Sequence, residues 1–151
     1  MFAKSTIAVC VSLLAIAGVI GKALAEDTFR AVADPATLQW VDTGEPFANT
    51  QIVVVDGDPS AAAPFILRFR CPDNYKIAAH THPAAEAVTV LEGTFYAGMG
   101  DKYDASQLTA VRRAGWFTIP AEAAHFGLCK GTTVLEIHAT GPWGTKMLKF
   151  Q

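Results

Sequence analysis

The sequence lacks the clusters of basic side chains that bind nucleic acids. Its 151 residues include 12 lysines and arginines against 14 aspartates and glutamates, and the only adjacent basic pair is Arg112 and Arg113. Binding to phosphates requires lysines and arginines gathered on one surface. With a formal net charge of -2 and one pair of arginines that a solvated hairpin end explains, the chain is not expected to bind nucleic acid.

Motifs of two common enzyme classes are also missing. The chain contains no G-x-S-x-G motif, which places the nucleophilic serine in many hydrolases, and no glycine-rich loop that would hold a phosphate group. No amphipathic helix of useful length follows residue 25. These absences argue against a serine hydrolase and a nucleotide-binding protein, and they favour an all-β fold.

Cysteine is scarce, with three in the chain. Cys10 lies within the apolar N-terminal run, which leaves Cys71 and Cys129 in the remainder. In an oxidising compartment such a pair can form a disulfide bond. The alternative is two small buried thiols, and that is the simpler expectation because the sequence does not give the distance between them.

The first 25 residues have the pattern of a secretory signal peptide. Lys4 precedes the almost wholly apolar residues 5–21, and Ala23-Leu24-Ala25 has the small-x-small form that signal peptidase cleaves. We predict cleavage after Ala25 and a soluble domain, residues 26–151, in the periplasm or secreted. A retained membrane anchor is the alternative, but an apolar run of about 17 residues is short for a spanning helix.

Short apolar segments separated by turn signals follow one another through the rest of the chain. In residues 65–70, Phe65, Leu67 and Phe69 occupy one face and two arginines the other, as in a half-buried strand. Such regular, short segments predict an antiparallel sandwich or barrel. The predicted strands are residues 38–41, 47–55, 65–70, 77–82, 86–91, 94–99, 108–111, 116–119, 124–129, 132–139 and 145–150.

The segment His80-Thr81-His82-Pro83 carries the strongest functional signal. On a strand, the two histidines point to the same face, roughly 6.6 Å apart at the backbone, so both can bind one metal ion. Pro83 has no N–H and should end the strand, which allows the chain to return Glu86 toward the histidines. A helix would separate the two imidazoles and would be broken at the proline.

A third histidine, His125, follows the apolar residues 116–119 and Pro120. The two stretches resemble the paired motifs of the cupin superfamily: H-x-H, a glutamate four residues on and a glycine seven later, then a proline shortly before a single histidine. The resemblance covers residues 74–93 and 115–129, and other segments look like those of small exported single-domain cupins.

Three positions depart from the cupin pattern. Asn74 and Glu122 stand where glycines are usual, and Cys129 stands where an asparagine is usual. Asn74 can adopt the left-handed turn that a glycine would supply. Glu122 conflicts with the same turn geometry.

The resemblance implies a single-domain cupin, which is a double-stranded β-helix or jelly-roll barrel of the RmlC-like type. It assigns His80, His82, Glu86 and His125 as ligands of one metal ion. Three imidazoles and one carboxylate suit a divalent transition metal (Mn, Fe, Co, Ni, Cu or Zn), whereas nitrogen donors disfavour Ca and Mg. Cupins often pair through sheet edges or swapped strands, so a homodimer is consistent with the resemblance.

Other residues are weaker candidates. His138 lies two residues from Glu136 on one strand face, where it could be a catalytic acid or base or a partner of a ligand. A solvated or core-bonded histidine is the simpler interpretation. Four aromatic residues could wall a pocket for a planar substrate, although we expect them in the core: Trp116, Phe117, Phe126 and Trp143.

Three functions compete. The first is an exported, metal-dependent oxidoreductase of dioxygenase type that acts on a small organic substrate. The second is a non-catalytic small-ligand or metal-binding sensor module, which the lack of a convincing acid or base beyond the ligands supports. The third, a metal-free epimerase-like cupin, is the weakest because such sites use other residues at these positions.

Overall fold

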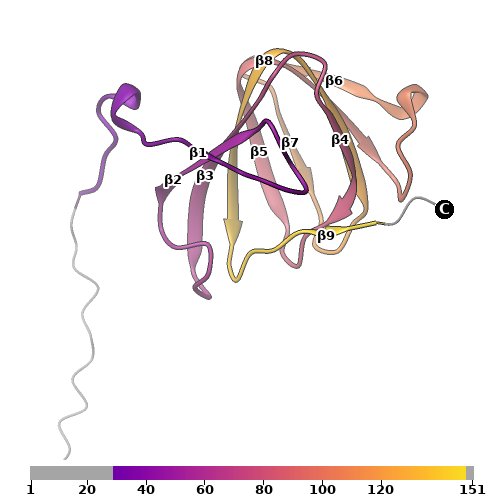
Figure 1. The fold of residues 1–151 in the computed structure, drawn as a ribbon. Coiled ribbons are helices and arrows are strands. Elements are labelled where there is room, and N and C mark those ends of the chain that lie inside the picture. Colours follow the sequence, from indigo (N-terminus) through magenta and orange to yellow (C-terminus); the bar gives the residue numbers. More distant parts are fainter. Residues whose placement is uncertain (1–28, 149–151) are drawn as a thin grey trace, which may run out of the picture. The chain divides into compact units, whose positions relative to one another are not determined.

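The computed structural model describes residues 29–148 (Figure 1). The predicted signal peptide and residues 149 and 150, which end the last predicted strand, lie outside this range. The chain divides into two units, Met1–Ala31 and Val32–Gln151, and every described element belongs to the second. None of the helices within residues 29–148 is long and apolar enough to cross a membrane.

The described part of the chain is almost entirely β-structure, with two short 3-10 helices. The elements are η1 (Pro35–Thr37), β1 (Val41–Asp42), β2 (Gln51–Asp56), β3 (Pro64–Cys71), β4 (Lys76–Thr81), β5 (Glu86–Met99), η2 (Ala105–Gln107), β6 (Thr109–Arg112), β7 (Trp116–Ile119), β8 (His125–Thr140) and β9 (Lys146–Met147).

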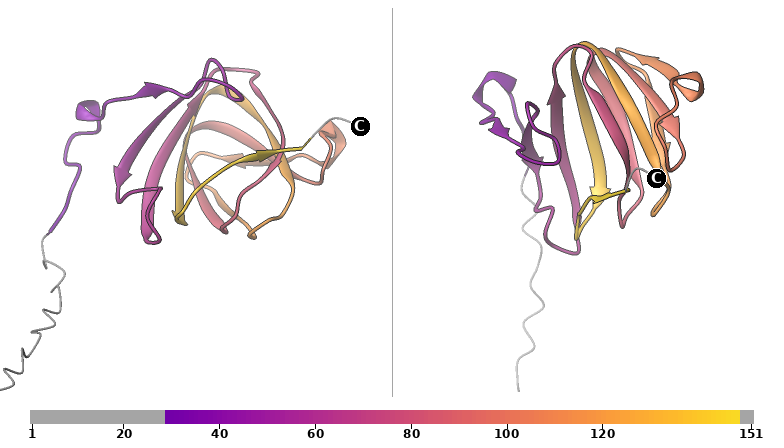
Figure 2. Two further views of the ribbon diagram at one scale, coloured as in Figure 1. Left: turned by 60° about the horizontal axis from the view of Figure 1, so that its bottom comes forward. Right: turned by 45° about the vertical axis from the view of Figure 1, so that its right-hand side comes forward.

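All the strands belong to one sheet, whose order is β1-β2-β3-β8-β4-β9, while β5 pairs with β6, β7 and β8. Long strands β5 and β8 run antiparallel along most of their length, from the pair Glu86 and Ala139 to the pair Met99 and His125. The views in Figure 2 show the sheet curling around an interior. The all-β jelly-roll prediction is confirmed.

The interior is formed by strand residues that alternate inward and outward. In β3, Phe65, Leu67 and Phe69 are buried, whereas the alternate residues Ile66, Arg68 and Arg70 are partly exposed. Val88 and Val90 of β5 join the same cluster. Full burial of such side chains stabilises the fold by about 1.5–3 kcal/mol each, and the same alternation decides which side chains can reach the barrel interior.

Two predicted strand pairs are single long strands. Residues 86–91 and 94–99 are joined in β5, and residues 124–129 and 132–139 are joined in β8. The turn signals at Gly93 and Gly131 are real, because both residues have positive φ, but they produce irregular register between β5 and β8. The prediction that a strand ends at each of these glycines was therefore wrong.

The N-terminal strands are shorter than predicted. Residues 38–41 were expected as a strand, but regular pairing begins at Val41, and residues 47–55 pair only from Gln51. A turn at 44–50 takes the intervening residues, with Asn49 at φ 67° and Phe47 donating its N–H to the Gly44 carbonyl at 2.8 Å. This turn brings Phe47 against the core cluster.

The two residues that replace motif glycines both adopt the left-handed conformation. Asn74 has φ 62°, as expected, and Glu122 has φ 59°. The backbone N–H of Glu122 donates to the carbonyl of His82 at 2.8 Å, which joins the two motif segments. Glu122 therefore makes the turn that a glycine would make, although this conformation is costly for a residue with a Cβ.

Cys71 and Cys129 form a disulfide bond, with their Cα atoms 6.4 Å apart. The expectation of two separate thiols was wrong, because strand pairing brings the end of β3 close to the first half of β8. Both cysteines are fully buried within the core cluster. The bond therefore links strands on which parts of the site are built.

Candidate metal centre

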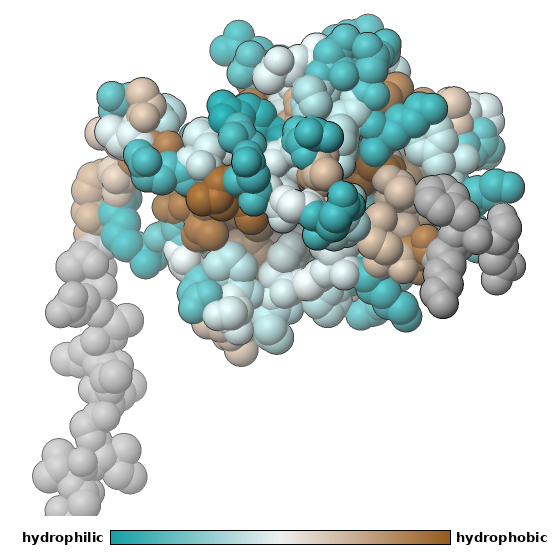
Figure 3. Space-filling model, viewed as in Figure 1, coloured by the Kyte–Doolittle hydropathy of each residue, from teal (hydrophilic) through white to brown (hydrophobic). Residues whose placement is uncertain are grey.

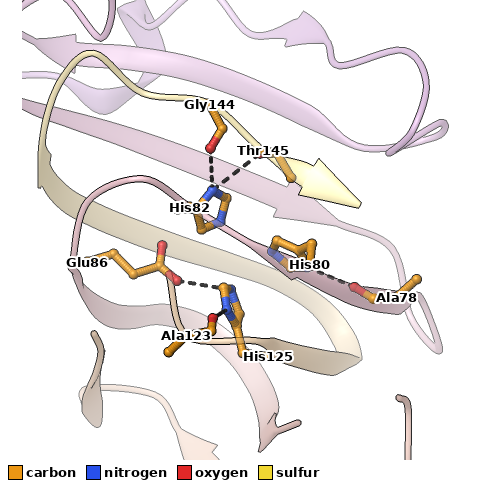
Figure 4. A network of polar contacts seen from close by, with 8 residues as sticks. All are labelled: Ala78, His80, His82, Glu86, Ala123, His125, Gly144 and Thr145. Atoms are coloured by element: carbon orange, nitrogen blue, oxygen red, sulfur yellow. Dashed lines mark hydrogen bonds and ion pairs between the residues drawn. The ribbon is translucent and has the colours of Figure 1, made fainter. Parts of the chain in front are cut away.

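Three histidines from the two motif segments converge inside the barrel (Figure 4). His80 is in β4, His82 follows that strand directly, and His125 begins β8. His80 and His125 are register partners in the antiparallel β4–β8 pair, so strand pairing places residues remote in sequence side by side. The ring centroids lie 4.1–5.2 Å apart, and each residue is at most 8% exposed.

Each of the three imidazoles is held through its Nδ1 atom by a backbone carbonyl. The Nδ1 of His80 lies 2.7 Å from the Ala78 oxygen, that of His82 is 2.8 Å from Gly144, and that of His125 is 3.0 Å from Ala123. A carbonyl only accepts, so Nδ1 carries the hydrogen and Nε2 is left as an acceptor. One ring nitrogen from each histidine lies within 4.8 Å of the others.

Glu86 begins β5 and is only 6% exposed. Its Oε1 atom lies 3.3 Å from Nε2 of His125. Because Nδ1 of His125 holds the hydrogen, this contact sets a lone pair of Nε2 against a carboxylate oxygen, and a proton or a cation is required between them. The structure thus brings the three predicted histidine ligands together in one group and places Glu86 beside one of them, His125.

The donor set fits a divalent transition metal. Three neutral imidazole nitrogens and an adjacent carboxylate are ligands that Mn, Fe, Co, Ni, Cu and Zn accept, whereas Ca and Mg prefer oxygen. The backbone acceptors behind the imidazoles resemble the outer contacts that orient histidine ligands in metal sites. The observation that supports this fit is that the three buried histidines bring together acceptor nitrogens with no hydrogen-bond donor among them.

Residues 143–145, near the C-terminus, also contact His82. The Trp143 ring stacks on the His82 ring at 4.1 Å between centroids, and the Thr145 hydroxyl lies 3.3 Å from His82 Nδ1. The backbone N–H of Trp143 donates to the Pro59 carbonyl at 2.7 Å, which fixes the position of this residue. Sequence reasoning considered Trp143 only as a pocket wall. It missed Gly144, because a carbonyl contact has no side-chain signal.

A cavity of about 320 Å³ adjoins the histidines and is lined mainly by apolar side chains. Phe117, Phe126 and Trp143 line this cavity, so the expectation that they are purely core was too narrow. Trp116 is 69% exposed and is neither core nor cavity wall. The side chain of His138 is 48% exposed and contacts Glu136 Oε1 at 3.1 Å, which matches the simpler interpretation of this residue.

Burial favours the neutral form of His80 and His82. Desolvation, with a contribution from the charge of His125, lowers the pKa of His80 to about 3 from 6.5. Desolvation also lowers the pKa of His82, although its hydrogen bond to Gly144 and the nearby Glu86 charge act in the opposite direction. Neutral imidazoles are the form that binds metal.

The stability of the metal-free protein should therefore fall as the solution becomes acidic. Between pH 6.5 and pH 3 the unfolded chain protonates residue 80, whereas the folded chain keeps it neutral. From pH 6.5 to pH 5 this difference removes about 2 kcal/mol from the free energy of unfolding. Urea unfolding with a chelator present measures it, and His80→Gln should flatten the profile. An equally steep profile in that variant would contradict the assignment.

The fold and the histidine cluster define a cupin. The chain matches the ChrR cupin-like domain over residues 28–143, and it belongs to this family. No curated protein matches the chain in sequence.

Solved structures of low sequence identity share the fold. The polyketide cyclase RemF from Streptomyces resistomycificus has a TM-score of 0.67 at 18% identity, with 82% of this chain and 88% of that one covered. A cupin-2 domain protein from Rhodospirillum rubrum has a TM-score of 0.63 at 16% identity, with 82% of each chain covered.

An enzyme structure is also similar over part of its length. Salicylate 1,2-dioxygenase from Pseudoaminobacter salicylatoxidans, in a structure of its gentisate adducts, has a TM-score of 0.56 at 14% identity. The alignment covers 71% of this chain but only 30% of the dioxygenase. At these identities the comparison establishes the fold alone.

Proposed function

We propose that this protein is a metal-dependent oxidoreductase of dioxygenase type that acts on a small organic substrate. His80, His82, Glu86 and His125 would hold one divalent ion of Mn, Fe, Co, Ni, Cu or Zn. The observation that carries the proposal is the set of three buried imidazoles, each fixed at Nδ1 by a backbone carbonyl with its other nitrogen turned to a common point.

When bound, such an ion would supply a Lewis-acid centre with positions left for an oxygen-bearing substrate or dioxygen. The chain's own residues prepare the site for it. The carbonyls of Ala78, Ala123 and Gly144 hold the rings in one tautomer and orientation. Glu86 adds one negative charge beside His125. The largely apolar cavity gives room for a substrate next to the imidazoles.

The structural neighbours agree with a small-molecule function. One is named as a polyketide cyclase and another as a salicylate dioxygenase, studied with gentisate. Both names describe enzymes that act on small organic compounds inside the same fold. Fold likeness at this identity is an analogy, so the proposal depends on the site of this chain.

A binding or sensor module without turnover is the second candidate. The observation in its favour is that the cavity has few side chains that could act as a general acid or base. Apart from the four proposed ligands, its polar lining residues in the described chain are Thr43 and Thr145. Neither hydroxyl is an efficient proton carrier near neutral pH.

Oxygen uptake separates the two candidates. Iron- or manganese-loaded protein is assayed with a panel of catechols and flavonols, and the proposed function predicts uptake with at least one compound. His82→Ala should lower that rate by at least about 100-fold, since it removes a ligand, whereas His138→Ala should keep it within about 2-fold. Binding of the panel without oxygen uptake, with every metal tested, would favour the sensor module.

We further propose that residues 1–25 are removed on export and that residues 26–151 function in the periplasm or outside the cell. The buried Cys71–Cys129 bond supports this location, because structural disulfides persist mainly in oxidising compartments. Mass spectrometry of the protein from fractionated cells should find a chain beginning at Glu26 outside the cytoplasm. An intact chain retained in the cytoplasm would contradict the proposal.

A further inference from the structure

The cavity beside the histidines has no positive side chain on its walls. Among the described residues that line it, none is lysine or arginine. Its charged and polar groups are the histidine cluster with Glu86, together with two threonines, and the remaining walls are apolar. A ligand placed there meets charged or metal-binding groups at the histidine cluster and mostly apolar side chains elsewhere.

The arrangement of β3 explains why cations are kept out of the cavity. Leu67 and Phe69 line the cavity, and the arginines between and after them point to the opposite face of the strand. Arg68 forms an ion pair with Glu136 at 2.8 Å, and Arg70 lies over the Trp40 ring at 4.3 Å. Each arginine is therefore held outside by its own partner, and neither is available to a ligand inside the barrel.

Several of the side chains that line the cavity are aromatic. Phe95 and Phe117 line the cavity with their rings nearly parallel, 5.6 Å apart and 9° between planes. On the cluster side, Trp143 lies parallel to His82. An apolar cavity of about 150 Å³ accepts benzene, and the cavity here measures about 320 Å³, so two fused rings fit its size.

Partly exposed apolar side chains of β2 also line the cavity. Ile52 and Val54 alternate on β2, so they share a strand face, and both line the cavity. Val54 is 43% exposed, and the nearby Val41 of β1 is 55% exposed without lining the cavity. Figure 3 shows hydrophobic surface among the mostly polar side chains of the face where β1 and β2 lie.

We propose that the cavity selects planar, apolar molecules of about two fused rings that carry a hydroxyl or similar oxygen on one edge and no charge on the opposite edge. The oxygen-bearing edge faces the histidine cluster, an orientation that rests on the proposed function. Phosphates and dicarboxylates are excluded because a buried charge without a partner is costly, and sugars because most of their hydroxyls would be buried without a hydrogen-bond partner.

A matched pair of probes tests the selection. Isothermal titration compares 2-naphthol with 6-hydroxynaphthalene-2-sulfonate, which has the same rings and hydroxyl and adds a charge on the far edge. Titrations are run on chelator-treated protein and on protein loaded with zinc, which does not undergo redox turnover. We expect 2-naphthol to bind at least about 100-fold more tightly than the sulfonate to chelator-treated protein, because the sulfonate finds no cation in the metal-free cavity. In zinc-loaded protein the ion is itself a cation, so the ratio should be smaller.

Adding a positive charge beside the cavity provides a complementary test. Val54→Lys should lower the ratio of 2-naphthol affinity to sulfonate affinity by at least about 10-fold, because it adds the missing cation beside the cavity. The control is Trp116→Lys, which places the same charge on an exposed residue that does not line the cavity, and it should change neither affinity.

Two results would overturn the inference. One is an affinity ratio of the two probes within about 3-fold in chelator-treated protein, and the other is failure of 2-naphthol to bind either form of the folded protein. Zinc content is measured separately on the same samples. Absence of zinc would contradict the proposed function, while the probe ratio in chelator-treated protein would still decide the inference.

Discussion

Replacing His125 with alanine is expected to reduce metal content from about one equivalent to less than about a tenth. The substitution removes one of three converging nitrogens and leaves Glu86 without its neighbour. Two histidines and a displaced carboxylate do not make a closed set of donors, and loss of a ligand is the severest change that a metal site can undergo. Mass spectrometric metal analysis after reconstitution and dialysis measures the effect.

His138→Ala is the matched control for this experiment. It removes an imidazole that is 48% exposed in its side chain and contacts Glu136 on the outside of the barrel. It should therefore retain full metal content. His125→Gln keeps more of the buried volume and separates loss of the ligand from loss of folding. A folded His125→Gln variant that still holds a full equivalent would contradict the assignment of His125.

The second large effect is expected from the disulfide bond. Changing both Cys71 and Cys129 to alanine should lower the free energy of unfolding by about 4 kcal/mol, because the bond closes a loop with a sequence separation of 58 and restricts the unfolded chain. Both residues are fully buried in the core, so loss of packing acts in the same direction. Urea unfolding of the metal-free protein measures the change.

Reduction of the wild type provides the control for the cysteine variant. Unfolding in the presence of a thiol reductant should give a midpoint close to that of the double alanine variant, while the reductant should leave the variant itself unchanged. A loss of less than about 1 kcal/mol in the variant would mean that the bond contributes little to the fold.

The part of the fold that could be predicted from sequence is the part determined by local alternation. Residues 65–70 read as a half-buried strand because burial imposes a period of two, and β3 extends from Pro64 to Cys71. The bends at Gly93 and Gly131 could not be distinguished from loops. A glycine at positive φ has the same local signal in both cases, and the pairing of the remote strands β5 and β8 decides between them.

The candidate site shows the same division. The ligand types and their order are readable in the motif, but their convergence depends on the pairing of His80 with His125 between β4 and β8. The carbonyl of Gly144 and the stacking of Trp143 on His82 arise from a segment more than 60 residues away. The disulfide was not predictable for the same reason, since the approach of Cys71 to Cys129 is set by tertiary structure.

Counting the metal in the native protein tests the central proposal most directly. Protein purified without an affinity tag, and without added metal or chelator, is analysed by inductively coupled plasma mass spectrometry against its own sulfur content. The buried imidazoles and Glu86 predict close to one equivalent of a single first-row transition ion. Less than about a tenth of an equivalent, with no gain after incubation with Mn, Fe, Co, Ni, Cu or Zn, would contradict it.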